Sequence, residues 1–444
     1  MKKLINWHFF LKQDIKYYGE FSFYLGTFFL ASALPLSGIF LLLSIFLSIL
    51  DTRYISLKDN WNKFLLLISG FFLINTLHFY FSTLDEKLYG FDKSISILSL
   101  FNWLPLFLIF FSFQKYLDNE NKRRNFAKSL TAGLIPVLIS CVMQYWFRIY
   151  GPKEILNGLI VWFNKPLFIN EFNKLVGNGG VSGLFSNQNY TGFWLSVTLP
   201  FTFALFNYYK NFNYKKFILI LILCTSVYFL FLTNSRNAIL GFLTSSVIVF
   251  GVKNLILLLF LISIFLLLLN LLGSFLPFFD FNITEYIFKS RVLLKFFQIN
   301  TVDLLAITRV KIWTNTLKMI IEKPLFGFGA STFPLIYNYI DAFPAQHAHN
   351  MPLQIAFEYG LPLSILLTTF ITLLFYKTWC TSFLTKNKSS LANKCWIAAS
   401  FAAIIHHLLD ITYYDGKISI LIWILLCGLK CILDESNNES KVLI

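Results

Sequence analysis

The sequence predicts an all-α polytopic integral membrane protein with about twelve transmembrane helices. Only 13% of its 444 residues are charged, 57% are hydrophobic, and Phe alone accounts for 53, whereas soluble domains carry about 25% charged residues. The mean hydropathy of +0.65 is likewise typical of a membrane protein. A span needs roughly 17 to 25 mostly apolar residues to cross about 30 Å of hydrocarbon. The twelve candidate spans are residues 20–33, 34–50, 64–81, 94–113, 127–147, 190–208, 217–232, 237–250, 255–276, 353–376, 395–409 and 418–433.

The distribution of positive charge sets the predicted orientation. With twelve crossings and an inner N-terminus, more than half of the 37 Lys and Arg residues fall on the cytoplasmic side, as the positive-inside rule requires. Treating residues 20–50 as one overlong helix, rather than two helices separated at Pro35, would place the Lys-rich N-terminus outside. Both termini are therefore expected in the cytoplasm. The net charge of +15 reflects this topology and anionic lipid rather than nucleic-acid binding.

The predicted spans divide the chain into three regions. Residues 1–272 carry helices one to nine with an outer segment at 148–189, residues 273–351 form a large outer loop between helices nine and ten, and residues 352–444 carry the last three helices and a cytoplasmic tail. Loops of this length usually carry function. In the large loop we expect an amphipathic helix that lies on the membrane surface and ends at Pro324. Its apolar positions recur at helical spacing: Ile307, Val310, Ile312, Trp313, Leu317, Ile320 and Ile321.

Two arginines are predicted to lie where the outer segments meet the membrane. Arg236 stands in LTNSRNAILG, the tight turn between two spans, and Arg309 stands near the start of the amphipathic helix. A guanidinium at this depth is costly unless it meets an anion or another partner. The alternatives are a snorkelling anchor for Arg236 and a solvated surface charge for Arg309.

Two histidines stand just before the tenth predicted span, in AQHAHNMPLQIAFEYG. Asn350 is the expected N-cap, with Met351 or Pro352 at the first helical positions. The positive end of the helix dipole disfavours an imidazolium at His349 and favours a neutral ring that can serve as a general base. His347 is then a supporting residue. The alternative is a histidine that only caps or packs the helix.

A metal site is a further alternative for this region. His347 and His349 could converge with His406, His407 and Asp410, which stand at the outer end of the eleventh predicted helix. HxH in a loop with HHxxD elsewhere is not a recognised ligand spacing, and the six cysteines form no CxxC pair and no outer pair. We therefore expect neither a metal nor another cofactor. Asp410 is expected instead to orient a histidine through a hydrogen bond.

Two arginines and a neutral histidine thus map to one side of the membrane. Two guanidiniums suit a diphosphate, which they bind bidentately and whose charge they stabilise as it leaves. A base on the same face suits activation of an acceptor hydroxyl. The combination predicts a lipid diphosphate substrate with its headgroup outside.

Four motifs resemble those of a known family. They are GLFSNQN at 183–189, TNSRNAILG around Arg236, TRVKIW followed by PLFGFG, and His349-Asn350 followed by Gly360 at the spacing around a catalytic histidine. Together they resemble the O-antigen ligase and O-antigen polymerase superfamily, bacterial enzymes that move glycans off undecaprenyl diphosphate. The resemblance covers most of the chain, because twelve helices with inner termini and a large loop between helices nine and ten are also that family's layout.

The resemblance implies His349 as the base and Arg236 and Arg309 as diphosphate ligands. It implies a fold similar to integral-membrane glycosyltransferases of the C type, without nucleotide sugar or metal, in the bacterial inner membrane with a periplasmic active site. The implied partners are an undecaprenyl-diphosphate-linked glycan donor, a glycan or lipid acceptor, and membrane lipid. Leu363 stands where the ligase motif often ends in a small residue or Tyr, so ligase and polymerase both remain open.

Two further readings stay open at this point. Asn187 and Asn189 either hydrogen-bond sugar or phosphate or cap the sixth predicted helix. The protein could also be a membrane transporter, for example of bicarbonate, or a flippase. Transporters usually place ionisable groups near the bilayer midplane, whereas the informative groups here cluster on one face, which favours chemistry at one surface.

Overall fold

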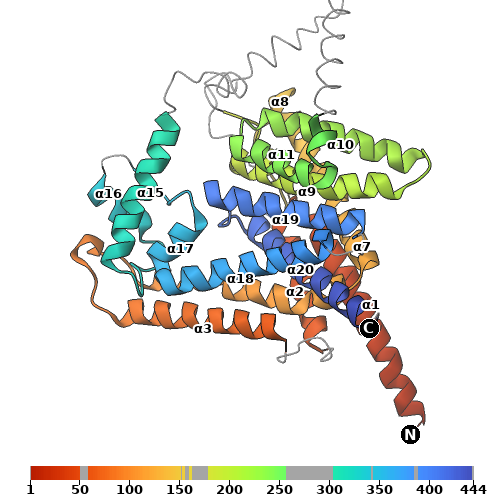
Figure 1. The fold of residues 1–444 in the computed structure, drawn as a ribbon, viewed down its shortest axis with the longest axis horizontal. Coiled ribbons are helices and arrows are strands. Elements are labelled where there is room, and N and C mark those ends of the chain that lie inside the picture. The colour runs from red at the N-terminus through yellow and green to blue at the C-terminus, as the bar shows by residue number, and fades with distance from the viewer. Residues whose placement is uncertain are drawn as a thin grey trace, which may run out of the picture.

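The computed structural model describes residues 2–50, 59–151, 153–155, 160–162, 179–256, 304–341, 344–384 and 389–442, most of them in helices (Figure 1). In these residues six helical segments are long and apolar enough to cross a membrane. They are Asn60–Phe81, Ser94–Ser112, Glu120–Tyr145, Tyr214–Leu232, Leu361–Leu384 and Gly416–Asn438. Leu34–Leu50 and Arg236–Phe250 are shorter apolar helices. A helical multi-pass membrane protein is thus supported, while the number twelve stays a prediction. Residues 257–276 of the ninth predicted span and much of both long outer segments lie outside the described residues.

The helices of the first half overlap the predicted apolar stretches, although the predicted spans 94–113 and 127–147 are each divided, at Trp103 and at Gly133. They are α1 Lys2–Phe29, α2 Leu34–Leu50, α3 Asn60–Phe81, η1 Glu86–Leu88, α4 Ser94–Leu98, η2 Ser99–Asn102, α5 Leu104–Ser112, α6 Gln114–Leu117, α7 Glu120–Ala132 and α8 Leu134–Tyr145. The helices of the second half are α9 Gln188–Tyr208, α10 Tyr214–Leu232, α11 Arg236–Phe250, α15 Leu304–Glu322, α16 Phe333–Ile340, α17 Met351–Tyr359, α18 Leu361–Trp379, η3 Cys380–Leu384, α19 Leu391–Leu409 and α20 Gly416–Val442.

A short β-hairpin in the first outer segment departs from the all-α prediction. β1 Lys153–Ile155 pairs antiparallel with β2 Ile160–Trp162, and Lys153 stands opposite Trp162. Each strand has three residues, so the hairpin is a local feature and not a layer of the fold.

The chain breaks between α1 and α2, as predicted at Pro35. α1 ends at Phe29 and α2 begins at Leu34, which puts Pro35 in the first turn, where its missing N–H costs no helical hydrogen bond. The two helices then pack as a hairpin. The Ser37 hydroxyl donates to the Gly26 carbonyl at 2.7 Å, and a Cβ on Gly26 would come within 2.7 Å of the Leu41 side chain.

The prediction of one continuous helix over 353–376 is wrong. The chain forms two helices there, α17 and α18, separated at Gly360, whose φ is +88°. A Cβ at this position would clash with the Leu325 carbonyl, and Leu361 N–H donates to the Pro324 carbonyl at 2.8 Å. The PLFGFG turn therefore packs into the break, so a tertiary contact interrupts an apolar stretch that looks continuous in sequence.

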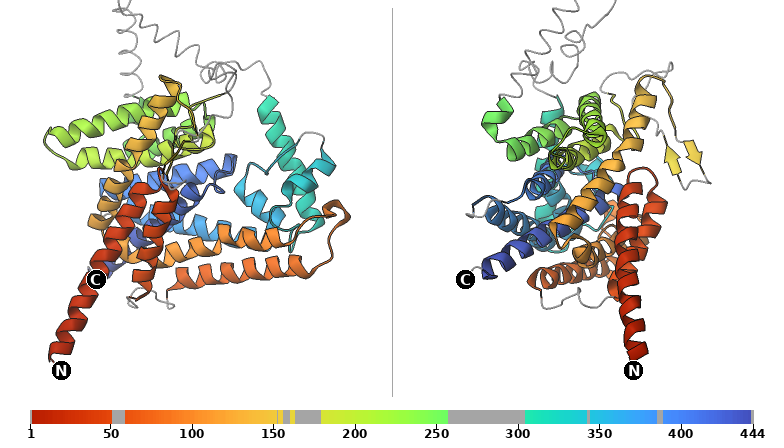
Figure 2. Two further views of the ribbon diagram at one scale, coloured as in Figure 1. Left: turned by 180° about the vertical axis from the view of Figure 1, so that it is seen from behind. Right: turned by 90° about the vertical axis from the view of Figure 1, so that its right-hand side faces the viewer.

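Two packed units result. α19 contacts α9 and α11 on one side and α18 and α20 on the other, and these helices share a large core that includes Trp194, Trp396 and Trp423. α15, α16 and α17 form a smaller unit with its own core around Phe328, Phe333 and Phe357. Figure 1 and the left view of Figure 2 show this smaller unit at one end of α3 and α18. We call it the outer unit, after the predicted topology.

Candidate active site

His349 stands in the loop that joins α16 to α17, within the outer unit. Ala345 and Ala348 are buried in the small core, whereas the His349 side chain is 30% exposed. His349 adopts φ +52°, a left-handed conformation that costs a non-glycine residue of order 1 to 3 kcal/mol and persists only where the surroundings enforce it. The loop is therefore held in shape by its contacts.

Asn350 provides the first of these contacts. Its Oδ1 accepts from Leu353 N–H at 3.0 Å, so Asn350 is the N-cap and α17 begins at Met351, as predicted. Its Nδ2 donates to the Leu408 carbonyl at 3.0 Å. The same side chain therefore starts α17 and ties the histidine loop to the last turn of α19.

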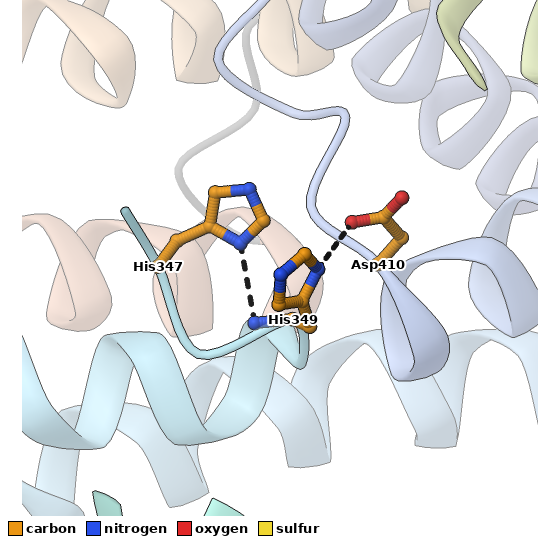
Figure 3. A group of neighbouring side chains, drawn as sticks. All are labelled: His347, His349 and Asp410. Carbon is orange, nitrogen blue, oxygen red and sulfur yellow. Dashed lines mark hydrogen bonds and ion pairs between the residues drawn. The ribbon is translucent and has the colours of Figure 1, made fainter. Parts of the chain in front are cut away.

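His349 forms a direct pair with Asp410 (Figure 3). His349 Nδ1 lies 2.9 Å from Asp410 Oδ1, and Asp410 Oδ2 accepts from Asn189 Nδ2 at 3.0 Å. The backbone N–H of His349 donates to His347 Nδ1 at 3.2 Å. The hydrogen bond expected between Asp410 and a histidine is thus present, and it joins the ends of α9, α17 and α19.

The surroundings of the pair keep Asp410 ionised, and burial keeps His347 neutral. Burial alone would raise the pKa of Asp410, but the hydrogen bond from His349 and electrostatic interaction with His349, His347 and Arg309 lower that pKa well below its usual range. For His347, burial lowers the pKa to about 4, with further lowering by His349 and Arg309 against the opposite effect of Asp410. Arg309 therefore lies within electrostatic reach of both residues, although it comes from α15.

Arg236 lies at the first position of α11, directly after the N-cap Ser235. The first turns of α9 and α11 touch, because a Cβ on Gly192 would come within 2.6 Å of Ala238 Cβ and 3.0 Å of Ser235 Cβ. Asn189 stands in the same turn of α9 as Gly192. The structure thus brings the helix starts that carry Asn189 and Arg236 together at one corner of the helix bundle.

Hydrogen bonds connect the segment before α9 to the turn between α10 and α11. Val181 N–H donates to the Leu232 carbonyl at 3.0 Å, and Asn234 Nδ2 donates to the Gly179 carbonyl at 2.7 Å. Asn187 is the N-cap of α9, and its Oδ1 accepts from Asn189 N–H at 2.8 Å. Of the two alternatives for these asparagines, Asn187 caps the helix, while the Asn189 side chain is directed at Asp410.

The predicted amphipathic helix is α15, which ends at Glu322 just before Pro324. It buries Ile312, Met319 and Ile320 and exposes Val310, Leu317 and Ile321. The PLFGFG turn that follows pairs with the end of α17: Phe328 N–H donates to the Phe357 carbonyl at 2.8 Å, and Gly329 N–H to the Glu358 carbonyl at 3.0 Å. This pairing connects the helix of Arg309 to the helix of His349. The placement of α15 on a membrane surface stays a prediction.

Part of the chain that includes His349 matches a known protein family. Residues 217–368 match the family model described as O-antigen ligase. This match supports the resemblance to the O-antigen ligase and polymerase superfamily over about a third of the chain. It supports a membrane glycan transferase that uses a lipid-linked glycan donor and an acceptor. No curated protein matches the chain.

The O-antigen ligase match contains Arg236, Arg309 and His349 but neither Asn189 nor Asp410. The structure is what adds these two residues to the matched region, through the hydrogen bonds of the Asp410 carboxylate. The candidate site is therefore assembled from both the matched and the unmatched parts of the chain.

The alternative metal set only partly comes together. In the described part of the chain, ligand atoms of His347, His349 and Asp410 lie within 4.8 Å of one another. His407 Nδ1 instead contacts the Ala403 carbonyl at 2.8 Å, and the buried His406 ring packs against Phe193. An ion between the first three would compete with existing hydrogen bonds at His347 Nδ1 and at both Asp410 oxygens.

Sequence reasoning missed three polar residues next to the site. Gln354 and Glu358 are buried in α17, and Tyr414 stands four residues after Asp410. Gln354 and Glu358 occur four residues apart in an apolar stretch, which places both on one helix face. Buried polar residues in such a stretch normally have a partner or a function, and that spacing was the signal available in the sequence.

Proposed function

We propose that this protein is a membrane glycosyltransferase that moves a glycan from undecaprenyl diphosphate to an acceptor hydroxyl, as a ligase or a polymerase of its superfamily. The observation that carries this proposal is the pair of His349 with the buried carboxylate Asp410 at the outer end of the helices. The proposed setting is the bacterial inner membrane, with both termini in the cytoplasm and the site on the periplasmic side.

In this mechanism His349 is the general base. Asp410 accepts a hydrogen bond from Nδ1–H of His349, which orients the ring and leaves Nε2 to take a proton. The acceptor hydroxyl attacks the anomeric carbon of the donor sugar and gives its proton to Nε2. Asp410 stabilises the imidazolium that forms. Because one displacement occurs, the anomeric configuration is expected to invert, and a product of retained configuration would exclude this mechanism.

Arg236 and Arg309 are proposed to bind the diphosphate. The bond between the anomeric carbon and the diphosphate oxygen breaks with its electron pair on that oxygen, and guanidiniums stabilise the charge that develops there. Arg236 starts α11, where the positive end of the helix dipole adds to the attraction for an anion. The influence of Arg309 on Asp410 supports its place near the reacting groups.

Transfer is proposed to need neither a metal nor a nucleotide sugar. The test compares wild type with His349→Ala, at matched expression and with and without EDTA, using an undecaprenyl-diphosphate glycan donor in detergent or membranes. Loss of transfer in the variant alone, with no effect of EDTA, supports the proposal. Loss of wild-type transfer in EDTA would refute the metal-free mechanism. A wild type that moves no glycan to any acceptor would favour a transporter or flippase instead.

A further inference from the structure

We propose that Glu358 is a positioning residue that holds the loops of His349 and Asp410 in register through Gln354 and Tyr414. This inference rests on the proposed function only for its consequence in transfer. The arrangement itself is a set of hydrogen bonds centred on one buried carboxylate, 5% exposed at the end of α17.

The Glu358 carboxylate accepts three hydrogen bonds from three different parts of the chain. Gln354 Nε2 donates to Oε1 at 3.0 Å, Ser331 N–H donates to Oε1 at 3.2 Å, and Tyr414 Oη–H donates to Oε2 at 3.2 Å. A buried carboxylate is tolerated where donors replace the water that it loses. Glu358 therefore links α17, the turn after PLFGFG, and the connection between α19 and α20.

One arm of this network reaches the histidine loop. Gln354 Oε1 accepts from Ala348 N–H at 2.8 Å, and Ala348 stands between His347 and His349. Its amide is fully buried together with its side chain. Gln354 thus uses its two ends to join the peptide between the histidines to Glu358, and this bond helps to enforce the left-handed φ of +52° at His349.

The other arm reaches the loop of Asp410. Tyr414 and Asp410 belong to the short connection between α19 and α20, so the bond from Tyr414 to Glu358 limits where Asp410 can stand. The two partners of the proposed catalytic pair are consequently fastened to the same carboxylate. The third donor, Ser331, has φ +66°, so a second strained residue adjoins the network.

Anchoring both loops to Glu358 matters because general-base catalysis depends on the position of His349 relative to Asp410 and the substrate. A misplacement of about 1 Å costs a transfer reaction of the order of 100-fold in rate, and a polar network that loses one member loosens the others. We therefore expect kcat to fall when either arm is cut, while the KM for the donor, which the arginines bind, stays the same.

The test uses near-isosteric variants. Gln354→Leu cuts the histidine arm, Tyr414→Phe cuts the Asp410 arm, and Glu358→Leu cuts both. Glu358→Gln is the conservative variant, because its Oε1 still accepts from Gln354 and Ser331 while Tyr414 can accept from the new amide. The matched control is Tyr337→Phe, which removes another tyrosine–carboxylate contact of the outer unit, to Asp341 Oδ2 at 3.4 Å. Asp341 stands at the α16 end of the histidine loop, whereas His347 and His349 stand near its α17 end.

Two measurements are made on each full-length variant in detergent. The first is transfer kinetics, with kcat and donor KM determined separately. The second is the rate at which diethyl pyrocarbonate modifies His349, measured by peptide mass spectrometry. The second reports how firmly the loop is held and needs no transfer activity. Thermal unfolding verifies that each variant is folded.

The expected result is a fall in kcat of about 10- to 100-fold for Gln354→Leu and Glu358→Leu, with unchanged KM and at least threefold faster modification of His349. Tyr414→Phe gives a smaller fall, Glu358→Gln stays within threefold of wild type, and Tyr337→Phe matches wild type. Wild-type kinetics and modification rates in folded Gln354→Leu and Tyr414→Phe would overturn the inference. If wild type transfers no glycan but Gln354→Leu still speeds modification, the positioning role stands and the proposed function falls.

Discussion

Two charged clusters lie at different ends of the helix bundle and are built differently. In the first, which the topology predicts to be cytoplasmic and which we call the inner cluster, Lys430 Nζ lies 3.2 Å from Asp59 Oδ2 and 2.6 Å from Asp434 Oδ2. Arg123 in the same cluster contacts Glu435 and Asn393. In the outer cluster, Asp410 pairs with His349 and interacts electrostatically with His347 and Arg309.

Under the proposed function, this difference separates a structural cluster from a reactive one. In the inner cluster the buried cations Lys430 and Arg123 each form an ion pair with a carboxylate. These ion pairs stabilise the packing of α3, α7 and α20. In the outer cluster a partly exposed ring in a strained conformation is held against a buried carboxylate. Arg236 stands at the start of α11 and Arg309 in the second turn of α15. In the proposed mechanism, these arginines attract the anionic donor and His349 is the base that the acceptor reaches.

The largest expected effect is a loss of transfer when the aspartate of the outer cluster, but not one of the inner cluster, is changed to asparagine. Asp410→Asn should lower transfer by about 100- to 10,000-fold, because an amide no longer selects the Nδ1–H tautomer of His349. Asp434→Asn, at the surface of the inner cluster, should leave kcat unchanged. Measured kcat values in protein of equal thermal stability test this. Equal losses in both variants would contradict the distinction between the clusters.

Breaking the inner cluster should instead act on stability. Lys430→Met leaves Asp59 and Asp434 without their shared cation, and removing one partner of a buried ion pair costs about 3 to 5 kcal/mol. The free energy of unfolding in denaturant should fall by less, about 1 to 3 kcal/mol, because the carboxylates left behind, Asp59 and Asp434, are 22% and 42% exposed and water can solvate them. Transfer per folded molecule should not change. A variant that unfolds like wild type but transfers poorly would reverse the assignment.

Arg236→Lys sharpens the comparison within the outer cluster. The variant keeps the positive charge but loses the bidentate geometry that suits a diphosphate, so kcat/KM for the donor should fall about 10- to 100-fold, equivalent to roughly 1.4 to 2.8 kcal/mol. The matched control is Arg124→Lys, because Arg124 pairs with Glu120 in α7 at 2.8 Å. Unchanged transfer in Arg236→Lys would count against diphosphate binding by this residue.

The smallest effect is a dependence of stability on pH. The pKa of His347 is lowered to about 4 in the folded protein from about 6.5 unfolded, so the unfolded state binds more protons between these values. Stability should therefore decline as the pH falls from about 6.5 to 4, by of order 1 to 2 kcal/mol after solvent screening. The thermal stability of His347→Gln should not show this decline between about pH 6.5 and about pH 4. An identical pH profile in both proteins would show that His347 does not supply it.

Much of the architecture could be predicted from the sequence because the hydropathy of a short stretch determines whether it forms a membrane-spanning helix. Apolar runs located α2, α9 and α10 to within a few residues, and Pro35 and Pro324 marked real helix ends. Asn350 was recognisable as an N-cap because capping needs only a polar side chain three residues before a free amide. The O-antigen ligase resemblance and the region that carries His349 were likewise readable from motifs.

The tertiary structure decided which polar groups meet. The sequence determined a membrane fold and the residues able to act as base and anion ligands, since hydropathy and side-chain chemistry are local properties. It could not determine that Asn189, His349 and Asp410 share hydrogen bonds, or that Gly360 interrupts an apolar run. Nor could it determine that Glu358 holds both loops. Those outcomes depend on how distant helix ends pack, and each contact exists only where several elements come together.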